Sequence, residues 1–236
     1  MLQLPPLQLP KVIAHRGASA YAPENTLAAF REARKRGASW IEIDVKLTAD
    51  NVPIVLHDSS LKRTLGIDRL AADMTAAELP VELPTFEATI ALLGELGLGC
   101  NVEIKPCPGR EAETARVTVA ALRKFWPKSL PSPLLSSFKP ASLIAARQAA
   151  PEFARAILLD DIKDDWREKA EAVGAVGVNT NGKRLTAPRA VEIKLAGYAL
   201  SVYTINDPAV AQALFGMGVD CVITDAPDLM GKVVGF

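Results

Sequence analysis

Eight strand-like segments alternate with helical patterns along this chain, and this alternation restricts its possible folds more than any other feature. The chain has 236 residues, 49% of them apolar, which is enough to bury the core of one large domain. The strand-like segments are residues 12–15, 40–45, 100–105, 133–138, 154–159, 175–179, 199–204 and 220–224. Helical patterns follow them, among them 111–125, 140–149, 187–196 and 208–216. Strands that alternate with helices favour a parallel sheet, and eight such units predict a TIM (β/α)8 barrel that spans residues 1–236 as a single domain.

Residues 53–57 form a further strand-like run that does not belong to the count of eight. The link at 46–52 is shorter than the roughly dozen residues that a parallel crossover needs. The sequence therefore predicts a β-hairpin that turns at residues 50–51 and runs back antiparallel. This return brings His57 beside Asp44.

The segment from residue 59 to about residue 83 interrupts the alternation of strands and helices. It contains a capping-box pattern at 75–78, which predicts a short helix. The next barrel helix then opens at Thr85 and runs to about Leu96. We expect this segment to be a small cap-like insertion on the catalytic face, where insertions cover the site or shape its specificity.

Acidic residues occupy alternate positions of the predicted strand 40–45. Side chains of an extended strand alternate between two faces, so Glu42 and Asp44 point to one side and the apolar residues between them to the other. The strand at 101–105 repeats this arrangement with Glu103. Buried carboxylates are costly unless a cation pairs with them, and carboxylate oxygens suit hard divalent cations. The two strands therefore indicate a cation at the top of the barrel.

The chain has only two histidines, and both end predicted strands at the rim where the carboxylates lie. They are His15, after the first strand, and His57, after the hairpin. Histidine changes charge near neutral pH, so a pair at this rim favours acid–base catalysis. Asp58 either orients His57 or is an exposed turn residue. Asp225 precedes Pro227 and is expected to cap the last helix.

Other polar and aromatic residues near these motifs have a structural interpretation beside the functional one. Asn25 or Thr26 can cap the helix that follows them, and Glu24 suits the positive end of that helix. Phe138 and Tyr203 either line a substrate cleft or pack in the core.

Composition excludes several classes of partner. The formal net charge is +0, with Lys+Arg and Asp+Glu both 27, which argues against nucleic acid and anionic membrane surfaces. No stretch is long and apolar enough to be a membrane anchor. Residues 1–10 lack the basic start of a signal peptide. The three cysteines are an odd number, which indicates free thiols in a reducing compartment and predicts a cytoplasmic protein.

Several short motifs occur together in a specific order along nearly the whole chain. They are His15-Arg16-Gly17, Pro23-Glu24-Asn25-Thr26, Glu42-x-Asp44-Val45, His57-Asp58 and Asn101-x-Glu103-Ile104-Lys105, with weaker matches at Ser137-Phe138, Tyr203-Thr204-Ile205-Asn206 and 219–225. Each motif alone is weak, but the ordered set is highly specific. The chain resembles the glycerophosphodiester phosphodiesterase family, in particular its short cytosolic bacterial members.

The resemblance implies a TIM barrel that hydrolyses glycerophosphodiesters, which are small molecules, to sn-glycerol 3-phosphate and an alcohol. It also implies one divalent cation, Mg²⁺ or Ca²⁺. The residues that match are Glu42, Asp44 and Glu103 as metal ligands, His15 and His57 as proton acceptor and proton donor, Arg16 and Lys105 as phosphate contacts, and Phe138 and Tyr203 as substrate-lining residues. Many members have tryptophan at the position of Tyr203. A salt-bridge network of the three carboxylates with Arg16 and Lys105 is the alternative that needs no metal.

Two other functions compete with this hypothesis. A related barrel phosphodiesterase acting on lysophospholipids or phosphoinositol head groups would show an apolar, membrane-facing rim, and residues 61–81 are not conspicuously aromatic or basic. A barrel that only binds glycerophosphate compounds would lack a catalytic histidine or carboxylate, and every expected position is filled.

Overall fold

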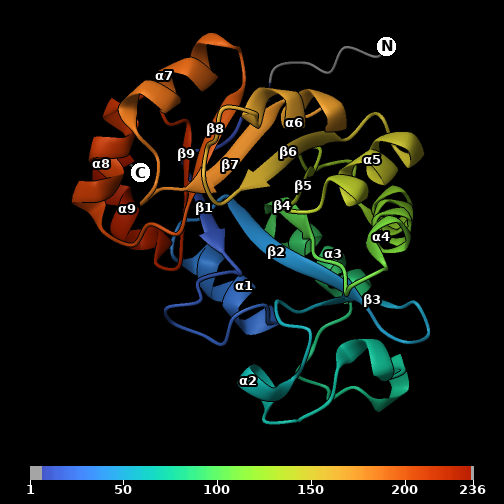
Figure 1. Ribbon diagram of the computed structural model, residues 1–236. Helices are drawn as coiled ribbons and strands as arrows, with labels where there is room; N and C mark the ends of the chain where they lie inside the picture. Colours follow the sequence, from blue (N-terminus) through green and yellow to red (C-terminus); the bar gives the residue numbers. More distant parts are fainter. Residues whose placement is uncertain (1–6, 235–236) are drawn as a thin grey trace.

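The computed structural model describes residues 7–234. Residues 1–6 and 235–236 lie outside the described part, so most of the N-terminal segment that was expected not to be a signal peptide is not covered. Helices surround a central barrel of strands, and the carboxyl-terminal helix α9 lies beside α8 (Figure 1).

Eight parallel strands close into the barrel. They pair in the order β1-β9-β8-β7-β6-β5-β4-β2, and a pairing of β1 with β2 closes the ring. The strands are β1 (Val12–His15), β2 (Trp40–Leu47), β4 (Gly99–Ile104), β5 (Leu134–Ser137), β6 (Ala154–Leu159), β7 (Gly177–Asn181), β8 (Ala199–Tyr203) and β9 (Cys221–Thr224). The predicted TIM barrel is confirmed.

Helices cover the outside of the barrel. They are α1 (Leu27–Lys35), α3 (Phe86–Leu96), α4 (Glu111–Phe125), α5 (Pro140–Ala149), α6 (Trp166–Val173), α7 (Ala187–Leu195), α8 (Pro208–Gly216) and α9 (Pro227–Val234). Two of them begin where a threonine accepts a backbone hydrogen bond: Thr26 accepts from Ala29 N, and Thr85 from Ala88 N. Of the two candidate caps of α1, Asn25 and Thr26, it is therefore Thr26 that caps the helix.

The predicted hairpin is confirmed and delivers His57 to the barrel rim. Strand β3 (Pro53–Val55) runs antiparallel to β2, with Val45 opposite Val55. Beyond β3, Leu56 N donates a hydrogen bond to Asp44 O at 2.9 Å. This hydrogen bond holds the next residue, His57, close to Asp44 of β2.

The insertion after the hairpin holds one helical turn, α2 (Lys62–Leu65), and two 3₁₀ turns, η1 (Ala71–Asp73) and η2 (Ala76–Glu78). The predicted capping box is present at the start of η2. A small apolar cluster separate from the barrel core fixes the insertion against the hairpin. Its buried members are Ile54, Leu56, Leu61, Ala71 and Met74.

The barrel interior is layered because side chains of each strand alternate between inside and outside. Inward apolar residues form one cluster: Ile13, Trp40, Leu134, Ala156, Cys221 and Ile223. Other inward positions are polar and buried, and three of them, Glu42, Asn101 and Ser136, line the cavity at the carboxyl ends of the strands. Polar chemistry is therefore concentrated at the end of the barrel where TIM barrels carry their active sites.

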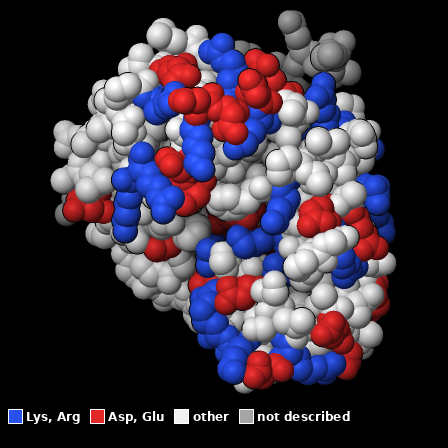
Figure 2. All heavy atoms as spheres, in the orientation of Figure 1, with Lys and Arg blue, Asp and Glu red and all other residues white. Residues whose placement is uncertain are grey.

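The surface shows no single dominant charge on the face drawn in Figure 2, where basic and acidic side chains intermix around a central hollow. This agrees with the net charge of +0. Among residues 7–234, no helix has both the length and the apolar character needed to cross a membrane. The three cysteines are buried and unpaired, as expected.

Candidate active site

A cavity of about 170 Å³ opens at the carboxyl ends of the barrel strands. It brings together eight of the nine residues that the sequence singled out. Its lining consists of His15, Arg16, Glu42, His57, Asn101, Glu103, Lys105, Ser136, Phe138, Leu158, Tyr203, Thr204 and Ile223. The ninth residue, Asp44, is only 1% exposed and belongs to the carboxylate cluster at this site.

Glu42, Asp44 and Glu103 form a compact cluster of buried carboxylates. One oxygen from each lies within 4.8 Å of the others. The parallel register of β2 and β4 places Asp44 opposite Glu103, and the alternation of β2 places Glu42 on the same inner face. Three carboxylate oxygens at this spacing can hold a divalent cation such as Mg²⁺ or Ca²⁺.

The protonation of this cluster reflects its crowding. Burial and the neighbouring carboxylates Asp44 and Glu103 raise the pKa of Glu42 well above its usual range. Burial, together with the charge of Asp44, raises the pKa of Glu103 to about 7. Burial also disfavours ionisation of Asp44, but the nearby Lys105 and Arg16 outweigh it and lower its pKa. The crowding thus opposes the simultaneous ionisation of all three carboxylates.

Unsatisfied oxygens show that the donor set fits a cation. Asn101 Oδ1 is buried and accepts no hydrogen bond from any described residue, and buried Asp44 Oδ1 has only an ion pair with Lys105 Nζ at 3.4 Å. A buried oxygen without a donor is costly, and a bound cation removes that cost. The salt-bridge alternative is present only in part: Lys105 Nζ lies 2.9 Å from Glu103 and 3.4 Å from Asp44, and Arg16 Nε lies 3.3 Å from Asp44.

Arg16 reaches the cluster through an unusual turn after β1. Its φ is 54°, in the left-handed region that non-glycine residues rarely adopt, and Gly17 follows with φ 82°. A Cβ on Gly17 would lie 2.7 Å from the backbone of Ala29, so glycine is required for this turn to pack on α1. The turn directs Arg16 N–H to Glu42 Oε2 at 3.1 Å. Strain of this kind is typical of functional sites.

Each histidine at the rim contacts a carboxylate through Nδ1. The distance from His57 Nδ1 to Asp58 Oδ1 is 2.6 Å, and that from His15 Nδ1 to Asp225 Oδ1 is also 2.6 Å. Since an ionised carboxylate only accepts hydrogen bonds, Nδ1 carries the proton in both rings and Nε2 remains available for a substrate. Burial lowers the pKa of His57. The site therefore has two oriented imidazoles beside one carboxylate cluster.

Comparison with known proteins identifies the family. The chain matches the model of the Glycerophosphoryl diester phosphodiesterase family over residues 15–229. This chain belongs to that family. A glycerophosphodiester phosphodiesterase of Bacillus subtilis (strain 168) is 29% identical to it over 255 residues, which cover 94% of this chain and 85% of that protein. The resemblance stated from the motifs is thus confirmed, and the protein is an enzyme of the phosphodiesterase class.

Solved structures of relatives agree with this assignment. The structure of an Oleispira antarctica phosphodiesterase in complex with the product sn-glycerol-3-phosphate superposes with a TM-score of 0.93 at 36% identity, covering 97% of this chain and 98% of the other. A glycerophosphodiester phosphodiesterase from Thermotoga maritima gives a TM-score of 0.80 at 28% identity, covering 94% and 97%.

The structure corrects the role expected for Asp225 in this phosphodiesterase barrel. Asp225 was expected to cap α9, but its carboxylate instead accepts hydrogen bonds from His15 Nδ1, from Ser19 Oγ at 2.8 Å and from Asn206 Nδ2 at 2.7 Å. Burial opposes its ionisation, yet the hydrogen bonds from His15 and Asn206 lower the pKa of Asp225 to about 2. Strand β9 pairs with β1 when the barrel closes, which brings this carboxylate to His15.

Replacing Asp225 with asparagine should lower kcat by about 10²-fold or more, because an amide no longer holds His15 in one tautomer. Comparing the phosphodiester hydrolysis rates of Asp225→Asn and of the control variant Asp228→Asn tests this expectation. Asp228 is a nearby carboxylate that binds Tyr21 and Arg36 rather than a histidine, so its variant should keep its activity. Equal rates for the two variants would contradict an orienting role for Asp225.

Two residues before α1 also have contacts that their expected structural roles did not include. Asn25 has φ 56° and donates a hydrogen bond from Nδ2 to Asp44 Oδ2 at 2.9 Å, so it helps to hold the acidic cluster. Glu24 was assigned to the positive end of α1, but its carboxylate accepts from Arg16 Nη1 at 2.9 Å and from Arg63. The sequence could not distinguish these roles from helix capping, because the same residue types serve both at the start of a helix.

The two aromatic residues predicted to contact substrate lie together on one side of the cavity. Phe138 and Tyr203 pack edge to face with ring centroids 5.9 Å apart. Lys105 Nζ lies 5.7 Å from the centroid of the Phe138 ring. Both rings line the cavity, and they also pack against each other.

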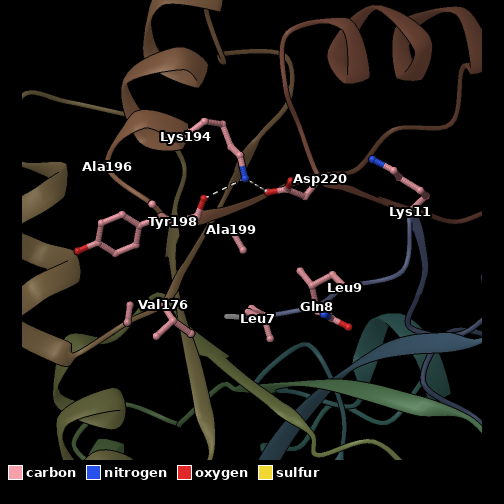
Figure 3. A pocket seen from close by; sticks show the side chains of 12 residues that line it. Leu7, Gln8, Leu9, Lys11, Val176, Lys194, Ala196, Tyr198, Ala199 and Asp220 are labelled. Carbon is pink, nitrogen blue, oxygen red and sulfur yellow. Dashed lines mark hydrogen bonds and ion pairs between the residues drawn. The ribbon is translucent and has the colours of Figure 1, made fainter. Parts of the chain in front are cut away.

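A second cavity, of about 770 Å³, lies at the opposite end of the barrel. Its lining comes from the amino ends of β1, β7, β8 and β9 and from α7 (Figure 3). Lys194 contacts Asp220 and the Tyr198 carbonyl there, so two of its three charged residues pair with each other. None of its described lining residues is a histidine or a cysteine. We therefore place the chemistry at the carboxyl-terminal end.

Proposed function

We propose that this enzyme hydrolyses glycerophosphodiesters to sn-glycerol 3-phosphate and an alcohol, using one divalent cation and two histidines. The observation that carries the proposal is the cluster of three buried carboxylates beside two carboxylate-oriented imidazoles. The family match supports the reaction class. The product bound to the Oleispira antarctica phosphodiesterase supports glycerol 3-phosphate as the product here.

Glu42, Asp44 and Glu103 would hold the cation, Mg²⁺ or Ca²⁺. When bound, it offsets charge on a non-bridging phosphate oxygen as the transition state forms. Arg16 presents a planar guanidinium suited to phosphate oxygens, and Lys105 adds a point charge. Their carboxylate neighbours outweigh burial and raise the pKa of both residues, so both stay charged.

His15 and His57 divide the proton transfers. We assign His15 Nε2 as the acceptor of the proton from the attacking hydroxyl or water, and His57 as the donor to the departing alkoxide. Asp225 and Asp58 stabilise the protonated imidazoles through Nδ1. Phe138 and Tyr203 would contact the glycerol or alcohol end of the substrate.

Phosphorus NMR of glycerophosphocholine tests this function directly. The purified protein is incubated with the substrate and with Mg²⁺, Ca²⁺ or EDTA. We expect the diester signal to convert to that of glycerol 3-phosphate with a metal and to persist with EDTA. The metal that gives faster conversion is the preferred cation. Conversion that continues undiminished in EDTA would contradict the metal requirement, and no conversion of any glycerophosphodiester would indicate a binding role.

Lysophospholipids are a second candidate substrate class, favoured by one observation. An apolar cavity of about 700 Å³ lies between the start of α1, the start of α3 and the insertion, and His57 is among its lining residues. Its apolar lining includes Leu56, Leu83 and Val81, which is 94% exposed. If this cavity accepts an acyl chain, lysophosphatidylcholine in the same NMR assay is converted to lysophosphatidic acid. A rate far below that of glycerophosphocholine would exclude it.

A further inference from the structure

Arg63, in the insertion helix α2, joins the insertion to the active site. Its Nη1 and Nη2 donate to the two carboxylate oxygens of Glu24 at 2.8 and 2.7 Å, and its Nε donates to Asp58 Oδ2 at 2.6 Å. One guanidinium therefore binds two carboxylates at once, with a bidentate contact to one of them. This geometry fixes both carboxylates relative to each other.

Each of these carboxylates holds one member of the site. Asp58 uses its other oxygen, Oδ1, to bind His57 Nδ1 at 2.6 Å. Glu24 Oε1 also accepts from Arg16 Nη1 at 2.9 Å. Arg63 is thus connected to His57 through Asp58 and to Arg16 through Glu24, without a direct contact to either of them.

We propose that Arg63 is a positioning residue: its guanidinium bridges Asp58 and Glu24, and through them it sets the orientation of both His57 and Arg16. This inference rests on the proposed function. It gives the insertion a part in assembling the site.

The electrostatics of the two carboxylates support this role. The hydrogen bond from Arg63 is the main reason that the pKa of Glu24 and that of Asp58 lie below their usual range. The Arg63 side chain is itself 48% exposed. A bidentate pair within a network contributes more to folding than a single exposed ion pair. A purely structural role therefore predicts lower stability with unchanged turnover of the folded enzyme, and a positioning role predicts a large loss of turnover.

The test compares two arginines of the insertion with the same exposure. Arg69 is also 48% exposed and pairs with Glu78, away from the site. Arg63→Met should lower kcat for glycerophosphocholine by about 10–100-fold, the range seen when partners of site residues are removed. KM should also rise, since Arg16 contacts the phosphate before and during reaction. Arg69→Met should keep wild-type kcat and KM.

A conservative variant and a double-mutant cycle distinguish positioning from damage to the fold. Arg63→Lys keeps the charge but cannot form the fork, so it should recover only part of kcat. In an Asp58→Asn background, Arg63→Met should lower kcat by a smaller factor than in the wild type, because the connection to His57 is already broken. Fully additive losses, or full activity in Arg63→Met, would overturn the proposal.

Nitrogen NMR of the imidazoles supplies a readout that does not depend on turnover. The chain has only two histidines, so their signals are assigned with His15→Asn and His57→Asn. Arg63→Met should shift the Nδ1 signal of His57 and leave that of His15 in place. An unmoved His57 signal would overturn the proposal. If the wild type hydrolyses no glycerophosphodiester, the proposed function fails by itself, and the His57 signal still tests the bridge.

Discussion

Alanine in place of His57 should lower the turnover of glycerophosphocholine by about 10²–10⁴-fold, the range that one positioned proton transfer contributes. The alkoxide that leaves a phosphodiester is a strong base, so a variant without the proton donor releases it slowly. His15→Ala should lose activity over the same range, because the nucleophile keeps its proton. Phosphorus NMR measures both rates, and circular dichroism establishes that each variant keeps the barrel.

The choice of leaving group separates the roles of the two histidines. A glycerophosphodiester of p-nitrophenol releases a phenolate, which is a far weaker base than an alkoxide and needs little protonation. His57→Ala should therefore recover most of its activity on this substrate, while His15→Ala should not. The reverse pattern would exchange the two assignments. Near-normal turnover of glycerophosphocholine by either variant would contradict the acid–base assignment of that histidine.

Glutamine in place of Glu42 should lower the affinity for Mg²⁺ or Ca²⁺ and lower turnover by about 10²–10³-fold at a fixed metal concentration. A metal that stabilises the transition-state charge is worth several kcal/mol, and each 1.36 kcal/mol is about tenfold in rate. The glutamine is nearly the same shape, and its Oε1 can still accept the hydrogen bond from Arg16 N–H. Titration calorimetry with each metal, together with rates across metal concentrations, measures the change.

The same variant should behave differently without metal. Glu42 is buried among Asp44 and Glu103, and the repulsion of these carboxylates opposes folding. Removing one charge should therefore leave the melting temperature in EDTA unchanged or raise it. Glu152→Gln is the matched control, because this exposed carboxylate pairs with Arg123 far from the cluster. Wild-type metal affinity in Glu42→Gln would place the cation elsewhere.

Local patterns were sufficient to predict where the acidic residues and the histidines of this site lie. The alternation within residues 40–45 placed Glu42 and Asp44 on the inner face, and the structure confirms that both are buried there. The short link after β2 predicted the hairpin, and with it the position of His57 beside Asp44. These predictions succeeded because strand periodicity and loop length depend only on residues close together in the chain.

The partners of these residues could not be predicted in the same way. Asp58 adjoins His57, but nothing local distinguishes an orienting carboxylate from an exposed turn residue. The left-handed turn that directs Arg16 N–H to Glu42 is equally invisible in the sequence, since it depends on the packing of Gly17 against α1.

By itself, then, the sequence determined the barrel, the hairpin, the inward carboxylates and the two histidines at the rim. Only the tertiary structure decided how these groups are oriented: His15 is held by Asp225, a residue 210 positions away, and Arg63 of the insertion holds both Asp58 and Glu24. The physical reason is that faces and turns follow from neighbouring residues. Hydrogen bonds between distant side chains exist only after β9 has closed against β1 and the insertion has packed on the hairpin.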